Sequence, residues 1–171
     1  NIAISLAMKG YKVILVDADL RNPSTAKVLG MQEQELGTLQ VLKGEVKIED
    51  AVQPYKDTSV MVLAGSSPIQ DTSTVLSGEN MRQFIKELEA KADFVVIDTP
   101  PSAMLSDAAI VAQYVDGAVF VIRQDYTEAD RILEGMEILS SSGAQITGCI
   151  LNDANVKGNS SEHYKNSYRL K

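Results

Sequence analysis

The stretch KVILVDADLRNPS, residues 12–24, joins an apolar run to two aspartates, an arginine and a proline. Its valines, isoleucine and leucine are typical of a buried β-strand. In an extended chain Asp17 and Asp19 point to the same side, and like charges held that close repel each other unless a cation or water separates them. The spacing alone leaves two interpretations open: a solvated strand end that closes into a turn at Asn22-Pro23, or a cation-binding site.

The length, composition and net charge of the chain favour a single acidic domain. The chain has 171 residues, 44% of them apolar, and a net charge of −7 at pH 7. This length is enough for one domain with its own core. The acidic balance argues against a nucleic-acid partner bound through phosphate neutralisation. No apolar run approaches the ~20 residues that are needed to cross a bilayer.

The single cysteine and single histidine exclude two kinds of site. Cys149 has no partner for an internal disulfide, which suits a reducing compartment. It lies in the apolar segment ITGCILN, so we predict a small core residue there. His163 lies in a polar segment near the end of the chain, and a histidine-based metal site is therefore not expected.

Apolar, β-branched runs alternate with helical patterns, which is typical of a parallel sheet with crossover helices. Several of these runs are apolar on both faces, as expected for strands covered by helices above and below. The fold class is therefore predicted to be α/β, a three-layer sandwich with a mostly parallel central sheet. The predicted strands are 12–17, 59–64, 94–98, 117–123 and 145–151, and the predicted helices are 78–91 with Ser77 as N-cap, 104–114, and 127–141 with Thr127 as N-cap. Short helices and loops are expected over 24–52, with breaks at Gly30, Gly37 and Gly44.

The two ends of the chain differ from this pattern. The first ten residues, NIAISLAMKG, resemble the last turns of a helix that ends at Gly10, which predicts a further segment upstream. The composition becomes polar from Asn152 onward. We therefore predict an N-terminally incomplete domain over residues 1–152 and a flexible tail over residues 153–171.

Polar residues follow three of the predicted strands, at the edge where open α/β sheets bind their ligands. One strand ends at Asp17 and Asp19, another at Asp98, and a third, CILND, offers Asn152. Three aspartates without histidine or cysteine partners form an oxygen site that suits Mg²⁺ held through water and substrate phosphates. The alternative is that each aspartate is an ordinary cap or turn residue. Their number at strand ends favours a magnesium–nucleotide site.

The same residues resemble a known family. ILVDADLRNP resembles the second nucleotide motif of the bacterial tyrosine kinases that regulate capsule and exopolysaccharide synthesis. FVVIDTPPS and the SDAAIVAQYVDGAVFVIRQDYTEAD segment after it resemble that family's Walker B region, and TVLSGENMRQFIKEL resembles the helix between the two motifs. The Asp-x-Asp-Leu-Arg-x-Pro string is specific, whereas IDTPP is shared with partition and division-site ATPases. The resemblance extends to about Asn152 and implies a P-loop NTPase-like fold.

This resemblance implies an ATP-dependent protein-tyrosine kinase that phosphorylates tyrosines on its own tail, with ATP and Mg²⁺ as cofactors. It implies that Asp17 contacts magnesium and helps to activate the attacking tyrosine hydroxyl. Asp19 would complete the acidic pair, and Asp98 would hold magnesium through water. Phosphoryl transfer does require a cation between phosphate oxygens and a carboxylate near the proton of the nucleophile.

Four further residues are assigned by analogy. Asn152 would hydrogen-bond the nucleotide base, or be an ordinary turn residue. Arg21 would steer a phosphate or an acidic partner at the nucleotide site, or pair with Asp19. Tyr164 and Tyr168 match the tyrosine cluster of the family's tail, and each phosphate there would add nearly two negative charges that repel a neighbour's acidic site. The alternative is a tail with two incidental tyrosines.

The sequence also departs from the family pattern. The strand and Gly-x-x-x-x-Gly-Lys-Ser/Thr loop that hold the β- and γ-phosphates do not occur in these 171 residues. Since that first strand would neighbour strand 94–98, we expect a gap in the middle of the sheet. The segment GSSPIQDTSTVL lacks the Pro-Asn-Pro pattern that is usual in the family, and two tail tyrosines are few.

Two rival functions are kept. A partition or positioning ATPase would share IDTPP but would not need the Asp-Leu-Arg-Asn-Pro string or a tyrosine tail. A catalytically silent domain that binds a polysaccharide-assembly membrane protein would account for the absent phosphate loop, but gives no reason to keep three aspartates together.

The resemblance further implies a location at the cytoplasmic face of a bacterial membrane. The link would be a membrane adaptor of the polysaccharide co-polymerase kind, or a fused transmembrane region. It also implies self-association of the intact protein.

Overall fold

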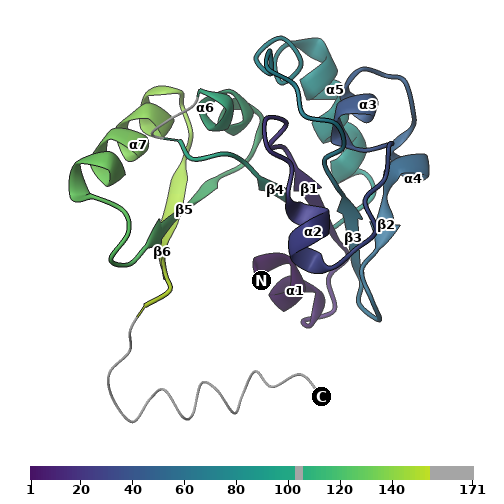
Figure 1. Cartoon of the computed structure of the whole chain (residues 1–171), viewed down its shortest axis with the longest axis horizontal. Helices are drawn as coiled ribbons and strands as arrows, with labels where there is room; N and C mark the ends of the chain where they lie inside the picture. Colours follow the sequence, from purple (N-terminus) through teal and green to yellow (C-terminus); the bar gives the residue numbers. More distant parts are fainter. Residues whose placement is uncertain (103–105, 155–171) are drawn as a thin grey trace.

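The computed structural model describes residues 1–102 and 106–154 (Figure 1). In chain order the elements are α1 Ile2–Ala7, β1 Val13–Asp17, α2 Thr25–Leu29, α3 Thr38–Leu42, α4 Ile48–Ala51, β2 Gln53–Pro54, β3 Val60–Leu63, α5 Glu79–Glu89, β4 Phe94–Asp98, α6 Asp107–Val111, the 3₁₀ helix η1 Ala112–Tyr114, β5 Ala118–Arg123, α7 Ala129–Ser141 and β6 Ile146–Asn152. Each end of the five predicted strands lies within about one residue of its prediction, a match well inside the usual uncertainty of strand boundaries. The predicted tail, with Tyr164 and Tyr168, lies largely outside the described residues.

The strands form two separate sheets. The first has the order β2-β3-β1-β4, in which β1 pairs in parallel with both β3 and β4. The short β2 pairs antiparallel with β3 at the edge, and the sequence pattern did not predict it. The second sheet is the parallel pair β5-β6, which Figure 1 shows with α7 to one side of the first sheet. Within the described ranges no ladder joins β4 to β5, which agrees with the expected gap beside strand 94–98.

Helices cover both faces of the four-stranded sheet, so the predicted three layers are confirmed there. On β1, Val13 and Leu15 belong to an apolar cluster that includes residues of α1 and α2. Ile14 and Val16 belong to the larger cluster on the opposite face, which is built from α3, α4 and α5. A strand apolar on both faces is required for a position inside such a sandwich.

The longest helix of this larger cluster, α5, is amphipathic. Its buried residues are Met81, Phe84, Ile85 and Leu88, at the spacing of one helical face. The predicted N-cap Ser77 is wrong, because α5 begins one residue later, after Gly78, whose φ of 82° suits glycine. The Gly78 N–H donates to the Tyr114 hydroxyl (3.0 Å), which ties the start of α5 to η1.

The third predicted helix also begins later than expected. Thr127 is not the N-cap of α7, because its backbone N–H closes a turn onto the Arg123 carbonyl (3.2 Å) and Glu128 takes the cap position. The helix expected over 104–114 is observed as α6 followed by η1, and residues 103–105 lie outside the described ranges.

The predicted core position of Cys149 is wrong. Cys149 is exposed on β6. The cluster between α7 and the second sheet is small, and Val119 and Val121 of β5 are also exposed, at 46% and 56%. A pair of strands with so little cover cannot bury its apolar side chains on both faces.

None of the helices in the described part of the chain is both long enough and apolar enough to cross a membrane.

Candidate functional site

Three aspartates converge at the carboxyl ends of β1 and β4. The parallel register sets Asp17 opposite Asp98 on the neighbouring strand. Asp19 follows in the loop after β1, and the charges of both Asp17 and Asp19 act on Asp98. We call these three residues the acidic cluster. The structure thus brings together the carboxylates that the sequence placed at separate strand ends.

Asp17 organises the loop that follows it. Its side chain is 1% exposed. Oδ1 accepts the Asp19 N–H (3.1 Å), and Oδ2 accepts the N–H groups of Ser24 (3.1 Å) and Thr25 (2.9 Å). Such charge-assisted bonds are stronger than neutral ones, so they hold the loop and the start of α2 against the end of β1.

Asp19 continues this arrangement. Its Oδ1 accepts the backbone N–H groups of Arg21 (3.2 Å) and Asn22 (2.9 Å). This is the local side-chain-to-backbone bonding by which aspartate forms turns. The turn interpretation of the DADLRNP string is therefore correct for the local geometry. It does not exclude the site interpretation, because the charge of Asp19 also acts on Asp98.

The pKa of Asp98 lies above its ordinary value. Loss of surrounding water raises the pKa of Asp98, and the negative charges of Asp17 and Asp19 raise it further. A bound cation would relieve this repulsion.

The donor set fits magnesium that is shared with a substrate. Within residues 1–102 and 106–154, no group of three or more His, Cys, Asp or Glu side chains could hold a metal ion by itself. Mg²⁺ at phosphate-handling sites takes one or two carboxylates and completes its shell with water and substrate phosphates. The all-oxygen acidic cluster matches that type of coordination and not a complete protein cage.

Gly65, just after β3, lies against the cluster, and sequence reasoning missed it. A Cβ atom at Gly65 would lie 2.2 Å from Cβ of Pro23 and 3.3 Å from Oδ2 of Asp17. Only a residue without a side chain allows the loops after β1 and β3 to approach this closely. A glycine directly after a buried strand is the signal that could have indicated this contact.

Arg21 does not form the predicted side-chain pair with Asp19. Its Nε donates to Oδ2 of Asp107 (2.8 Å) and its Nη2 to Oδ1 of the same carboxylate (3.2 Å). Nη1 donates to the Gln70 carbonyl (2.8 Å), and Nη2 also donates to Oγ1 of Thr72 (2.7 Å). Asp107 and Thr72 were not among the residues that the sequence singled out.

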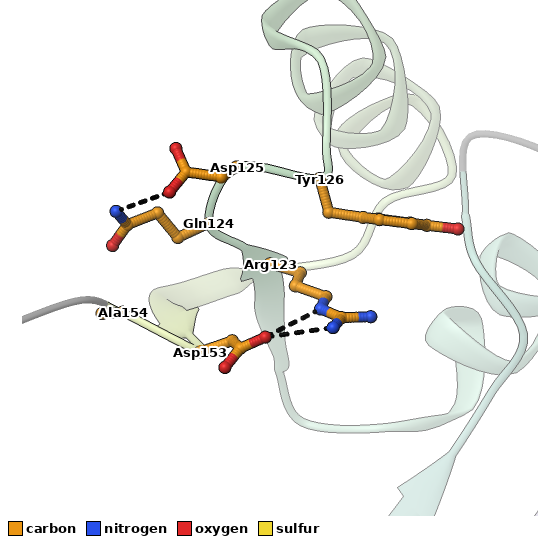
Figure 2. Close-up of a pocket in the computed structure, with 6 residues that line it drawn as sticks. All are labelled: Arg123, Gln124, Asp125, Tyr126, Asp153 and Ala154. Atoms are coloured by element: carbon orange, nitrogen blue, oxygen red, sulfur yellow. Dashed lines mark hydrogen bonds and ion pairs between the residues drawn. The ribbon is translucent and has the colours of Figure 1, made fainter.

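A cavity of about 430 Å³ lies at the carboxyl ends of β5 and β6 (Figure 2). Its lining residues are Arg123, Gln124, Asp125, Tyr126, Asp153 and Ala154. Figure 2 shows the Arg123 guanidinium bonded to Asp153, at 3.0 Å from Nη2. The same guanidinium lies 5.0 Å from the centre of the Tyr126 ring.

The predicted base ligand Asn152 ends β6, next to the lining of this cavity. Its carbonyl accepts the Gln124 N–H (3.0 Å), which ties the two strand ends together. Asp125 and Asp153 on the lining have φ values of 57° and 56°, in the left-handed region. Such backbone conformations are costly for non-glycine residues and concentrate at functional sites.

Comparison with known proteins identifies the family. Residues 1–142 match the family model described as AAA domain. The tyrosine-protein kinase YwqD of Bacillus subtilis (strain 168) is 32% identical over 164 residues, which cover 96% of this chain and 69% of the relative. The chain belongs to the bacterial tyrosine-protein kinases. The predicted resemblance is thereby confirmed.

Solved structures support the same family and fold. The kinase domain of the Escherichia coli tyrosine kinase ETK has a TM-score of 0.84 at 28% identity, over 93% of this chain and 62% of that one. The septum site-determining protein MinD of Pyrococcus horikoshii, solved as a complex with Mg-ADP, has a TM-score of 0.74 at 26% identity, over 90% of this chain and 63% of that one. The P-loop NTPase-like α/β fold is therefore confirmed. The two rival functions are not favoured, because the relatives are named as kinases.

Proposed function

We propose that the intact protein is an ATP-dependent protein-tyrosine kinase and that the acidic cluster is its catalytic centre. The observation that carries this proposal is the convergence of Asp17, Asp19 and Asp98 at one sheet edge, in a chain of the bacterial tyrosine-protein kinase family. The proposal extends to ATP and Mg²⁺ as the phosphate donor and its metal.

Each aspartate has a distinct proposed task. Asp17 and Asp98, paired across β1 and β4, would hold the metal, and Asp19 would complete the acidic pair. From the family resemblance, Asp17 is also proposed to help activate the hydroxyl of the incoming tyrosine. When bound, Mg²⁺ would supply neutralisation of phosphate charge.

The cavity after β5 and β6 is the proposed binding site of the nucleotide base. Its volume of about 430 Å³ lies within the usual range of small-molecule sites, roughly 300–1,000 Å³. Arg123 and Tyr126 offer planar groups on which a ring can stack. By the family analogy Asn152, at the end of β6 next to this lining, would hydrogen-bond the base.

The acceptors and the cellular setting are proposed from the sequence resemblance. Tyr164 and Tyr168 would accept the phosphates, and the kinase would regulate capsular or exopolysaccharide synthesis and export. It would self-associate and act at the cytoplasmic face of the membrane, through a polysaccharide co-polymerase adaptor or a fused transmembrane region.

The test is the intact mass of the purified protein before and after incubation with Mg²⁺ and ATP. The proposal predicts added phosphate that disappears in the Tyr164→Phe/Tyr168→Phe variant. As a matched control, Tyr11→Phe removes an exposed tyrosine that lies before β1, away from the carboxyl ends of the strands, and should leave the added phosphate on the tail. Consumption of ATP without any added phosphate would instead identify a switching ATPase.

A further inference from the structure

We propose that Arg21, Thr72 and Asp107 form a positioning clamp for the acidic cluster, and that Arg21 acts through this clamp and not as a ligand of the nucleotide phosphates. The proposal rests on the kinase function proposed above and deepens it.

The three side chains form a closed hydrogen-bonded triangle. Arg21 donates to both carboxylate oxygens of Asp107, at 2.8 and 3.2 Å, and to Oγ1 of Thr72 at 2.7 Å. The Thr72 hydroxyl donates in turn to Oδ1 of Asp107 at 2.9 Å. Thr72 and Asp107 are both 0% exposed, so the bond between them is shielded from water, whereas the Arg21 side chain is 31% exposed.

The triangle joins the loops that follow three neighbouring strands. Arg21 lies in the loop after β1, Thr72 in the segment after β3, and Asp107 at the start of α6, after β4. The Ile69 N–H adds a backbone bond to the Leu20 carbonyl (2.9 Å) beside Arg21. The loop that carries Asp19 is therefore held from two sides. These contacts help to set the distance between the carboxylates that follow β1 and the Asp98 carboxylate at the end of β4.

The same bonds leave Arg21 poorly suited to bind phosphate. In the described residues four of the five N–H groups of Arg21 donate to protein acceptors. The paired carboxylate of Asp107 neutralises the guanidinium, and the charges of Asp19 and Asp71 act on it as well. An arginine whose N–H groups are mostly bonded and whose charge is neutralised binds an incoming anion weakly.

The clamp requires arginine and not any cation. A guanidinium is a planar fork that can reach both oxygens of one carboxylate and a third acceptor at fixed angles, whereas an ammonium is a point charge on a flexible stem. Arg21→Lys therefore keeps the charge and breaks the triangle. Thr72→Val, nearly equal in volume, removes the hydroxyl and keeps the ion pair.

Kinetics of these variants test the clamp. Thr72→Val and Arg21→Lys should each lower kcat about ten- to a hundredfold, the scale expected when reacting groups shift by about 1 Å, with the KM for ATP changed less than about twofold. The double variant should be no worse than the poorer single one, because both substitutions break the same network. Thr74→Val is the matched control, since its exposed hydroxyl donates to Asp71 in the same segment (3.0 Å) and is bonded to no member of the triangle, so its loss should leave kcat unchanged.

Three results would overturn the clamp: a raised KM for ATP at unchanged kcat in Arg21→Lys, a silent Thr72→Val, or effects that multiply in the double variant. Amide hydrogen exchange separates this proposal from the kinase function, because it needs no catalysis. Thr72→Val should speed exchange of the Ser24 and Thr25 amides that bond Asp17, and Thr74→Val should not. If the wild type transfers no phosphate, the kinase proposal fails and exchange alone decides the clamp. Unchanged protection of these amides would then refute it.

Discussion

Replacing Gly65 with alanine should destabilise the protein by forcing apart the loops after β1 and β3. The new methyl group would lie 2.2 Å from Cβ of Pro23. Carbon atoms in contact are normally about 3.5–4.0 Å apart, so one of the two loops must retreat by at least about 1.3 Å. The side chain of Pro23 is a rigid ring, and Pro23 lies in the loop that Asp17 and Asp19 hold in place. It cannot move away by changing rotamer, as a flexible side chain could.

The expected loss in the free energy of unfolding is about 1–3 kcal/mol, the usual cost of overpacking. Backbone conformation adds nothing to this cost, because Gly65 is not among the glycines with positive φ in the described residues. The methyl group would also lie 3.3 Å from Oδ2 of Asp17, which accepts the Ser24 and Thr25 amides. Phosphate transfer should therefore fall together with stability.

Urea unfolding measures this effect: the midpoint of the transition should move to lower urea concentration while the m-value, the dependence of the free energy of unfolding on urea, stays the same. Gly148→Ala is the matched control, because a Cβ there meets nothing within 4 Å and its φ is not positive. This control should be as stable as the wild type, or more stable by up to about 1 kcal/mol through the less flexible unfolded chain. If Gly65→Ala unfolds at the wild-type midpoint while Gly148→Ala behaves as stated, the close approach of the two loops is refuted.

The other predictions concern the acidic cluster and the core. Without Mg²⁺, Asp98→Asn should raise the free energy of unfolding, because the neutral amide escapes both the loss of water and the repulsion of Asp17 and Asp19. Because the pKa of Asp98 is raised, the folded wild type binds this proton more tightly than the unfolded chain does. The difference in free energy of unfolding between Asp98→Asn and the wild type should therefore widen as the pH rises above about 3.9. A difference that stays constant with pH in urea melts would contradict the raised pKa. Calorimetric titration with Mg²⁺ and ADP should give an affinity that weakens on acidification through the raised pKa, and a flat profile would remove Asp98 from the metal site. Leu88→Ala, at a side chain with 0% exposure, should cost about 2–5 kcal/mol in the same urea assay, whereas a loss below about 1 kcal/mol would place Leu88 outside the core.

Local patterns were sufficient for the sheet and for the acidic cluster. The runs ending at Asp17 and Asp98 are apolar on both faces, and such runs form central parallel strands. Parallel strands end at a common edge, so aspartates at two strand ends had to approach each other. The gap beside β4 was expected from the family resemblance and not from local patterns.

Features that depend on distant partners were not predictable. Arg21 and Asp107 are 86 residues apart, and nothing near either residue indicates the other. The N-cap prediction at Ser77 failed because Gly78 takes the cap position and the Ser77 hydroxyl donates to the Ser73 carbonyl (2.6 Å). Cys149 was misjudged because the burial of a strand depends on what covers it, and α7 leaves β6 largely exposed.

The central claim is that the acidic cluster carries phosphoryl transfer, and Asp98→Asn tests it most directly. The variant is isosteric, and a urea melt of the same sample checks that it folds as stably as the wild type before its activity is compared. The rate of phosphate incorporation from Mg-ATP, measured by intact mass, should fall by more than about a hundredfold, the equivalent of several kcal/mol of lost charge stabilisation. Incorporation within about tenfold of the wild-type rate would contradict the account, because transfer would then not depend on the carboxylate at the end of β4.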